Sequence, residues 1–432
     1  MDKFVIKGGQ RLAGTVRISG SKNAALPILA SSLLADGRCV IKGVPYLRDV
    51  DTLLQILGEL GVKSRRRTDG AIETAVVDER PYVARYELVK TMRASICVLG
   101  PLLAKRRRAR VSQPGGCVIG VRPIDLHEKG LKLLGTKFKY EHGYLIGDGR
   151  KLAGAEIYLG GSCGSTVTGT ANVLMAAVLA KGKTVIECAA CEPEVQNLAH
   201  FLVKMGARID GIGTPHLVIH GVKSLKGTTH TIIPDRIETG TFILAGAMTK
   251  GKLIIENCRV EHISALIDKL SEIGVKVKKL SPNRCMVLPA RAIRPADVAT
   301  LPYPGFPTDL QAQLMALLSL ADGISVITEK IYPDRFMHIA ELNRMGANIR
   351  KDGPMAVVQG VKRLYGAPVM ASDLRASAAL VLAGLAASGT TEVQRVYHID
   401  RGYERIETKL QHLGAHIKRM PDTESSESKS SE

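Results

Sequence analysis

The stretch Leu60-Gly61-Val62-Lys63 has the pattern of a helix end that runs directly into a strand. Its glycine stands where a helix C-cap needs a left-handed residue. The stretch recurs as Leu134-Gly135-Thr136-Lys137, Met205-Gly206-Ala207-Arg208, Ile273-Gly274-Val275-Lys276, Met345-Gly346-Ala347-Asn348 and Leu413-Gly414-Ala415-His416. The successive glycines are 74, 71, 68, 72 and 68 residues apart. The chain therefore consists of six similar units.

Two further markers indicate what each unit contains. In five units an Ala- or Leu-rich helix breaks at a glycine 23 to 25 residues before the capping glycine, as at Leu34-Ala35-Asp36-Gly37. Apolar alternation between paired glycines, as in residues 4–14, is typical of a hairpin. A period near 70 residues is too long for common solenoid repeats and fits a βαβαββ unit. Because the Ala/Leu helices are apolar nearly all round, we expect them to be buried with sheets outside, in two α/β lobes of three units each.

The composition is that of a two-domain α/β enzyme. At 432 residues the chain exceeds one ordinary core, and its 45% hydrophobic content includes no Trp. The net charge of +19 favours anionic partners, namely phosphorylated metabolites, nucleic acid or acidic membrane. Residues 1–7 lack the apolar run of a signal peptide, and no stretch approaches 18 uninterrupted apolar residues, so we expect a cytoplasmic protein without membrane insertion. Residues 421–432 are Ser/Glu-rich and are expected to form a disordered tail.

Cations stand in the first turn of four expected helices, at Lys22, Arg93, Arg236 and Arg375. There they oppose the positive end of the helix dipole, which costs about 0.3 kcal/mol or more each. A bound anion would reverse that sign, because free N–H groups and a cation can share one phosphate or carboxylate. The residues Ser21, Asp235 and Thr308, which also stand at helix starts, are explained as ordinary N-caps. If the helix starts of each lobe face one cleft, that cleft attracts polyanions.

The basic runs at 65–67 and 105–108 raise the alternative of a nucleic-acid partner. They have no interleaved aromatic residues for base stacking and match no nucleic-acid motif, so solvated loop charge is the preferred explanation. The chain also lacks a Walker A loop and a strand followed by GxGxxG. A non-catalytic six-repeat protein that binds anions or RNA stays the alternative of a different class.

The segment Ser112-Gln-Pro-Gly-Gly-Cys117 places one thiol on a Pro-Gly-Gly turn, with Arg122 five residues further on. Glycines in such a turn let the backbone approach a ligand closely. The other seven cysteines are expected to be inert packing. Cys117 is therefore the candidate reactive thiol.

Several motifs are more specific together than any one is alone: Gly20-Ser-Lys-Asn-Ala-Ala-Leu-Pro27, Arg93-Ala-Ser95, the Cys117 loop with Arg122-Pro-Ile-Asp-Leu126, Pro234-Asp-Arg-Ile-Glu-Thr-Gly240, Phe306-Pro-Thr-Asp309, Asp334-Arg-Phe-Met-His338, Ser372-Asp-Leu-Arg-Ala-Ser377 and Tyr397-His-Ile-Asp-Arg-Gly-Tyr-Glu-Arg405. With them the chain resembles, from about residue 2 to 419, the bacterial UDP-N-acetylglucosamine 1-carboxyvinyltransferases of the EPSP synthase family. The resemblance implies a two-domain inside-out α/β barrel of six βαβαββ repeats, with residues 22–232 in one lobe, residues 1–21 plus 233–420 in the other, and ligands closing the cleft between them.

The same resemblance implies a reaction. The enolpyruvyl group of phosphoenolpyruvate moves to the 3′-hydroxyl of UDP-N-acetylglucosamine and phosphate is released, which is the first committed step of peptidoglycan synthesis. Cys117 would protonate the methylene carbon and Asp309 would accept the hydroxyl proton, while Lys22, Arg122 and Arg401 would hold phosphate and carboxylate. The remaining substrate-binding residues implied are Asn23, Arg93, Pro123, Ile124, Asp125, Leu126, Ser162, Cys163, Gly164, Ile331, Arg335, Asp373 and Arg375.

The expected partners are these two small molecules, with no cofactor, no metal and no nucleic acid, and the oligomeric state is left open, with a monomer as one option. The sequence departs from the family at Gly161, where many relatives carry lysine before Ser162. The nearest rival is the shikimate-pathway enolpyruvyl transferase, which shares the repeat but lacks the cysteine loop.

Overall fold

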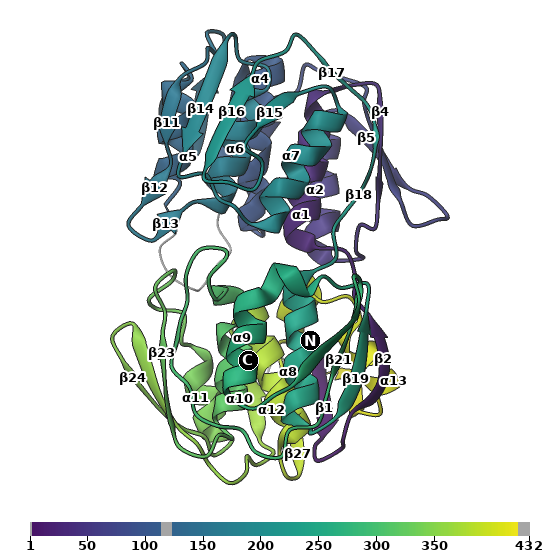
Figure 1. Ribbon diagram of the computed structural model, residues 1–432. Helices are drawn as coiled ribbons and strands as arrows, with labels where there is room; N and C mark the ends of the chain where they lie inside the picture. Colours follow the sequence, from purple (N-terminus) through teal and green to yellow (C-terminus); the bar gives the residue numbers. More distant parts are fainter. Residues whose placement is uncertain (1, 114–122, 422–432) are drawn as a thin grey trace, which may run out of the picture. The chain divides into compact units, whose positions relative to one another are not determined.

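The computed structural model describes residues 2–113 and 123–421, which form two compact units (Figure 1). Unit 1 consists of residues 2–19 and 234–421, and unit 2 of residues 20–113 and 123–233. The chain passes from one unit to the other after residue 19 and again after residue 233. Of the tail expected at 421–432, all but the first residue lies outside the described residues.

The part of unit 2 that the structure describes contains three four-stranded sheets of one pattern. In each sheet the first two strands are parallel and the next two are added antiparallel. In sheet order the strands are β18 (Thr229–Thr231), β4 (Arg38–Lys42), β6 (Ile72–Val76) and β5 (Val62–Arg66); β7 (Val83–Ala84), β8 (Arg108–Ser112), β10 (Tyr144–Asp148) and β9 (Lys137–Glu141); β11 (Glu156–Tyr158), β14 (Lys183–Glu187), β16 (His216–His220) and β15 (Arg208–Asp210).

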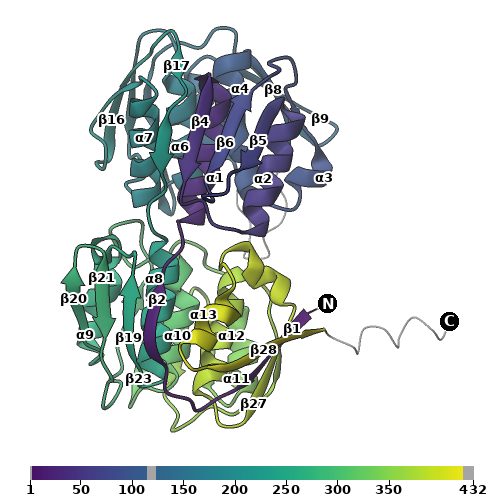
Figure 2. The same ribbon diagram turned by 90° about the vertical axis from the view of Figure 1, so that its right-hand side faces the viewer.

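The described residues of unit 1 repeat the pattern in three more sheets. Their strands are β26 (Pro368–Met370), β27 (Thr390–Gln394), β1 (Asp2–Lys7) and β28 (His416–Pro421); β2 (Ala13–Arg17), β19 (Lys252–Glu256), β21 (Arg284–Val287) and β20 (Val277–Ser281); β22 (Val298–Ala299), β23 (Ile324–Thr328), β25 (Met355–Gln359) and β24 (Asn348–Asp352). The first and last described strands, β1 and β28, pair with each other (Figure 2).

Six glycines end the helices that precede the outermost strands β5, β9, β15, β20, β24 and β28. Their φ angles run from 75° at Gly61 to 110° at Gly206, which confirms the left-handed conformation predicted for them. The helices that they end are α2 (Arg48–Glu59), α5 (Asp125–Leu133), α7 (Pro193–Lys204), α9 (Ser264–Glu272), α11 (His338–Arg344) and α13 (Ile406–His412).

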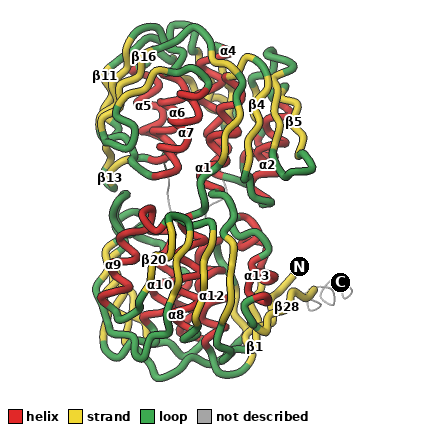
Figure 3. Tube along the Cα trace, turned by 45° about the vertical axis from the view of Figure 1, so that its right-hand side comes forward, coloured by secondary structure: helices red, strands yellow, loops and turns green. Residues whose placement is uncertain are grey.

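A second set of helices lies inside each unit, with the strands outside them (Figure 3). Every residue of α8 (Arg236–Met248) is buried, as the all-round apolar sequence predicts. The same holds for all but the first and last residues of α12 (Leu374–Ala386). The other members of this set are α1 (Lys22–Ser31), α4 (Leu99–Arg106), α6 (Val167–Ala177) and α10 (Gln311–Leu318). Each unit therefore has a hydrophobic core of its own.

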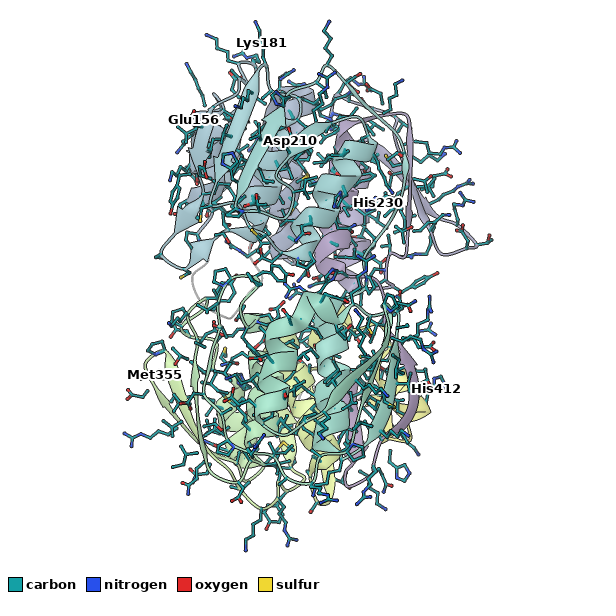
Figure 4. All side chains as sticks on the ribbon, viewed as in Figure 1. Glu156, Lys181, Asp210, His230, Met355 and His412 are labelled. Carbon is teal, nitrogen blue, oxygen red and sulfur yellow. The ribbon has the colours of Figure 1, made fainter. Side chains whose placement is uncertain are left out.

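The outer surface carries the long charged side chains, such as those of Glu156 and Lys181 (Figure 4). Among the helices of the described ranges, none is long and apolar enough to cross a bilayer.

The basic runs are not uniformly solvated. Lys105 forms an ion pair with Asp36, and its side chain is only 16% exposed. Arg106 and Arg66 each donate to three backbone carbonyls. The prediction of solvated loop charge is therefore wrong for these three residues, because folding brings carbonyls and carboxylates from distant loops to them.

Candidate active site

Asp309 lies between two arginines in unit 1, in the 3₁₀ turn η4 (Thr308–Leu310) that leads into α10. Its Oδ1 accepts from Arg335 Nη1 at 2.8 Å, and its Oδ2 accepts from Arg375 Nη2 at 2.9 Å. The arginine side chains are 7% and 4% exposed, against 27% for the aspartate. Burial acts to raise the pKa of Asp309, but Arg375 and Arg335 outweigh it and hold that pKa well below its ordinary value. Asp309 is therefore ionised at neutral pH.

Thr308, expected to be an N-cap, makes no capping bond. Its hydroxyl donates to Glu329 Oε2 at 2.9 Å and accepts from Arg335 Nη1 at 3.0 Å. The N-cap prediction is thus wrong here, because the buried carboxyl of Glu329 competes for the hydroxyl. Glu329 Oε1 also accepts from Thr300 Oγ1 at 2.6 Å and from the backbone N–H of Ile331 at 2.9 Å. Glu329 thereby connects Ile331, a predicted contact residue, through the hydroxyl of Thr308 to Arg335, which binds Asp309.

Asp373 begins α12 as its N-cap, and its Oδ1 accepts from the backbone N–H groups of Arg375 at 2.8 Å and Ala376 at 3.2 Å. The cap fixes the first turn from which Arg375 reaches Asp309. The sequence thus predicted two residues, Asp373 and Arg375, whose positions depend on each other.

Arg401 ends the 3₁₀ helix η5 (Val396–Arg401), which packs against α12. Burial and the charge of Arg401 lower the pKa of His398, whereas Asp373 acts in the opposite direction. Both Arg401 and Asp373 therefore lie within electrostatic reach of the same imidazole. His338 is fully buried nearby, where burial lowers its pKa to about 4 and Asp373 opposes that effect.

In unit 2, Lys22 and Asn23 open α1, whose N-cap Ser21 accepts from the backbone N–H of Ala24 at 3.4 Å, as predicted. Lys22 Nζ lies 3.0 Å from Oδ2 of Asp49 on α2, and both side chains are largely buried. No motif pointed to Asp49, because its burial depends on how α2 packs against α1.

The two ion pairs bear on the helix-dipole argument. Lys22 has Asp49 as an anion, and Arg375 has Asp309. The structure therefore provides carboxylates of its own for two of the cations that the sequence marked for bound anions.

Arg93 opens the 3₁₀ helix η2 (Arg93–Val98), and its Nη2 donates to the carbonyl of Pro123 at 3.3 Å. Ile124, the next residue, is 9% exposed. Burial and the charge of Arg93 lower the pKa of His127 to about 3, so this imidazole is neutral. These contacts bring Arg93 and the segment 123–127 together at one end of α5.

His127 is held by a defined hydrogen-bond chain. Asn172 Oδ1 accepts from the backbone N–H of Gly100 at 2.7 Å, which orients its amide so that Nδ2 donates to His127 Nδ1 at 3.0 Å. The proton of the neutral ring is thus on Nε2, which donates to Thr168 Oγ1 at 3.1 Å.

In the predicted contact segment 162–164, Ser162 and Cys163 form a tight turn between β12 (Gly160–Gly161) and β13 (Gly164–Ser165), and Gly164 begins β13. A Cβ added at Gly161 would lie 3.0 Å from Leu126 Cδ1, so the turn packs directly on another predicted contact residue. Asp125 and Leu126 are the first two residues of α5. Unit 2 thus brings the segment 123–126 together with the turn around Ser162.

The roles predicted for the thiol of Cys117 and the guanidinium of Arg122 stay predictions. Cys117 and Arg122 lie outside the described residues. Of the seven cysteines that are described, four are buried, in line with inert packing. Cys163 is exposed, so the expectation of packing is wrong for it, because the β12–β13 turn carries its side chain into solvent.

The fold and the sequence define a class of protein. The family model described as EPSP synthase (3-phosphoshikimate 1-carboxyvinyltransferase) matches residues 6–410. The enolpyruvyl transferase NikO from Streptomyces tendae superposes with a TM-score of 0.88 at 25% identity and covers 97% of this chain and 99% of its own. An EPSP synthase from Acinetobacter baumannii gives a TM-score of 0.74 at 17% identity over 98% of this chain and 100% of its own.

Curated relatives narrow the class. The UDP-N-acetylglucosamine 1-carboxyvinyltransferase of Lawsonia intracellularis is 54% identical over 97% of this chain and 99% of its own. That of Geotalea uraniireducens is 53% identical over 98% of this chain and 100% of its own. The chain therefore belongs to the EPSP synthase family, and within it to the UDP-N-acetylglucosamine 1-carboxyvinyltransferases.

Proposed function

We propose that the protein transfers the enolpyruvyl group of phosphoenolpyruvate to the 3′-hydroxyl of UDP-N-acetylglucosamine, releases phosphate, and so performs the first committed step of peptidoglycan synthesis. The observation that carries this proposal is the identity of 53–54% over nearly the whole chain with relatives of that name. The cluster of Asp309, Arg335 and Arg375 supports it, since it couples an ionised carboxylate to two buried cations.

The reaction first adds a proton and an oxygen across the carbon–carbon double bond, and then eliminates phosphate together with a proton from the new methyl group, so it needs an acid and a base. Each group of this kind typically contributes about 10²–10⁴-fold in rate. We assign Cys117 as the acid that protonates the methylene carbon and Asp309 as the base for the sugar hydroxyl. The two arginines keep Asp309 ionised but make it a weak base. An anionic substrate group that binds Arg375 would raise the pKa of Asp309 toward its ordinary value and strengthen it as a proton acceptor.

The cations hold the anionic groups and stabilise charge that develops during the reaction. We assign Lys22, Arg122 and Arg401 to the phosphate and carboxylate of phosphoenolpyruvate, with Asn23 and Arg93 beside them. The sugar nucleotide is assigned to the segment 122–126, the turn at 162–164, Asp309 and Ile331. Arg335, Asp373 and Arg375 complete the set of assigned residues.

The proposal extends to the finer fold. Each unit would be an inside-out barrel of three βαβαββ repeats, with lobes of 22–232 and of 1–21 plus 233–420. The repeated strand order and the buried helices support this arrangement. The partners would be small molecules in the cytoplasm.

A phosphate-release assay tests the function. Phosphate should appear only when phosphoenolpyruvate and UDP-N-acetylglucosamine are both present. Replacing the sugar nucleotide by shikimate 3-phosphate distinguishes the shikimate-pathway activity that the family description names. Well-folded protein that releases phosphate only with shikimate 3-phosphate, or with neither acceptor, would refute the proposal.

A further inference from the structure

A basic pocket of about 580 Å³ lies in unit 2 beside the sheet β7–β8–β10–β9, a volume typical of small-molecule sites. Strands β8 and β9 of this sheet are labelled in Figure 2. Among the described residues, none of those assigned to the active site lines it. The cations that line it are Arg106, Arg107, Arg108, Lys137, Lys139 and Arg150.

The pocket is short of negative charge. Asp148 is the only carboxylate among the described lining residues, and it is already bound: it accepts from Arg150 Nε at 3.0 Å and from Arg150 Nη2 at 2.6 Å. The carboxylates of Asp78 and Glu79 do not line the pocket, but they interact electrostatically with Arg106. Glu141 likewise pairs with Lys139 at 3.3 Å. The lining cations still outnumber these carboxylates, and an anion placed among them reduces the repulsion between them.

Two of the cations are held in fixed positions. The guanidinium carbon of Arg108 lies over the ring of Tyr82, 4.0 Å from the ring centre. A guanidinium can make a bidentate contact with a phosphate. Arg106 is anchored by backbone carbonyls, including that of Leu60 at 2.5 Å from its Nη2, and these do not neutralise its charge. Arg106 and Arg108 are therefore held in place, whereas Lys137 and Lys139 are exposed.

The strand register places the carboxylate of Asp148 between cations of two neighbouring strands. Arg108 on β8 and Lys137 on β9 are both register partners of Asp148 on the central strand β10. Ile146 lies two residues earlier on the same face of β10, opposite Lys139. Because neighbouring strands are about 4.8 Å apart, the cations of β8 and β9 are roughly 10 Å apart. A chain of three phosphates spans this distance and can contact cations of both strands at once.

We propose that this pocket binds the triphosphate chain of a small molecule. Inorganic triphosphate and a nucleoside triphosphate share that chemistry, and only the second adds a planar group that can lie on the side chain of Ile146. The site is independent of the proposed catalytic function, since none of its lining residues takes part in that reaction.

Isothermal titration calorimetry on the full chain tests this proposal, with inorganic triphosphate and adenosine triphosphate as separate probes. The titrations are run with and without saturating UDP-N-acetylglucosamine, so that binding at the proposed catalytic site is separated. We expect saturable binding that survives the sugar nucleotide. Tighter binding of adenosine triphosphate than of inorganic triphosphate would identify the nucleotide as the source, and equal affinity would identify the phosphate chain alone.

The matched variants are Lys137→Ser/Lys139→Ser on β9 and Lys276→Ser/Lys278→Ser at β20, the corresponding edge strand of a unit 1 sheet. Both pairs remove the same charge from exposed positions, and circular dichroism checks that both variants fold. The β9 pair should weaken triphosphate binding at least tenfold, and the β20 pair less than twofold. Equal losses, the absence of saturable binding, or tighter binding of an RNA oligonucleotide that both pairs weaken alike would overturn the proposal.

Discussion

Replacing Thr308 by valine should impair turnover, whereas the same replacement at Thr300 should not, although both changes remove the same kind of bond. Each hydroxyl donates to Glu329, at 2.9 Å from Thr308 and 2.6 Å from Thr300. Each also accepts from one N–H donor, Arg335 Nη1 for Thr308 and the backbone N–H of Lys330 for Thr300. The two threonines therefore differ in whether they touch the arginine that binds Asp309.

The expected magnitudes follow from these bonds. Losing one hydrogen bond to a carboxylate costs about 2 kcal/mol, so both variants should unfold at a temperature lower by about 4–8 °C in a unit of this size. In Thr308→Val the guanidinium of Arg335 loses one of its two acceptors, and the loss of about 1.4 kcal/mol in the transition state lowers kcat/KM roughly tenfold. In Thr300→Val, kcat/KM should change less than twofold.

Scanning calorimetry measures the stability and two-substrate phosphate release measures kcat/KM. Both assays use the full chain, and activity is measured well below either unfolding temperature. Equal losses of kcat/KM in the two variants would show that the threonines act only through the stability of unit 1. Unchanged kcat/KM in Thr308→Val would refute the positioning of Arg335 by this hydroxyl.

Three further predictions concern the thiol and a buried imidazole. Cys117→Ser should lose most turnover but keep its affinity for the sugar nucleotide in equilibrium binding, and full turnover would show that another group is the acid. An electrophilic epoxide phosphonate should label Cys117 before the exposed Cys163, as read by peptide mapping, and prior labelling of Cys163 would count against the assigned acid. Burial and Arg93 lower the pKa of His127 to about 3, below the ~6.5 of an unfolded histidine, so the unfolded chain takes up the proton first as pH falls. Between pH 7 and pH 5 this residue should therefore cost unit 2 about 2 kcal/mol of unfolding free energy, and urea unfolding of His127→Gln should lack that loss; an identical pH dependence in both proteins would contradict it.

The repeat could be predicted from sequence because it depends on local rules. A glycine such as Gly61 must take a left-handed conformation wherever a helix ends and a strand follows at once, so its spacing reveals the repeat. The unit that lacks a glycine after Lys105 shows the limit of that rule, since Arg107 there takes a φ of 60°.

The site could be predicted only where motifs mark it. Asp309, Arg335 and Arg375 lie in separate motifs, and the structure joins them by direct ion pairs. Glu329 and Asp49 carry no motif, because their importance comes from partners brought by tertiary packing. Thr308 was misread for the same reason: its N-cap pattern is local, but its actual partner lies 21 residues away.

The pairing of β1 with β27 and β28 has a consequence during synthesis. The strand β1 leaves the ribosome before the other described strands, yet its partners β27 and β28 are the last two strands of the described chain to be made. The main segment of unit 2 is complete once residue 233 has emerged, so that unit can fold while an N-terminal arm stays unpaired beside it. An arm with open strand edges invites wrong pairing. The nascent chain is therefore most in need of a chaperone after unit 2 is complete and before β28, the final strand of unit 1, has been made.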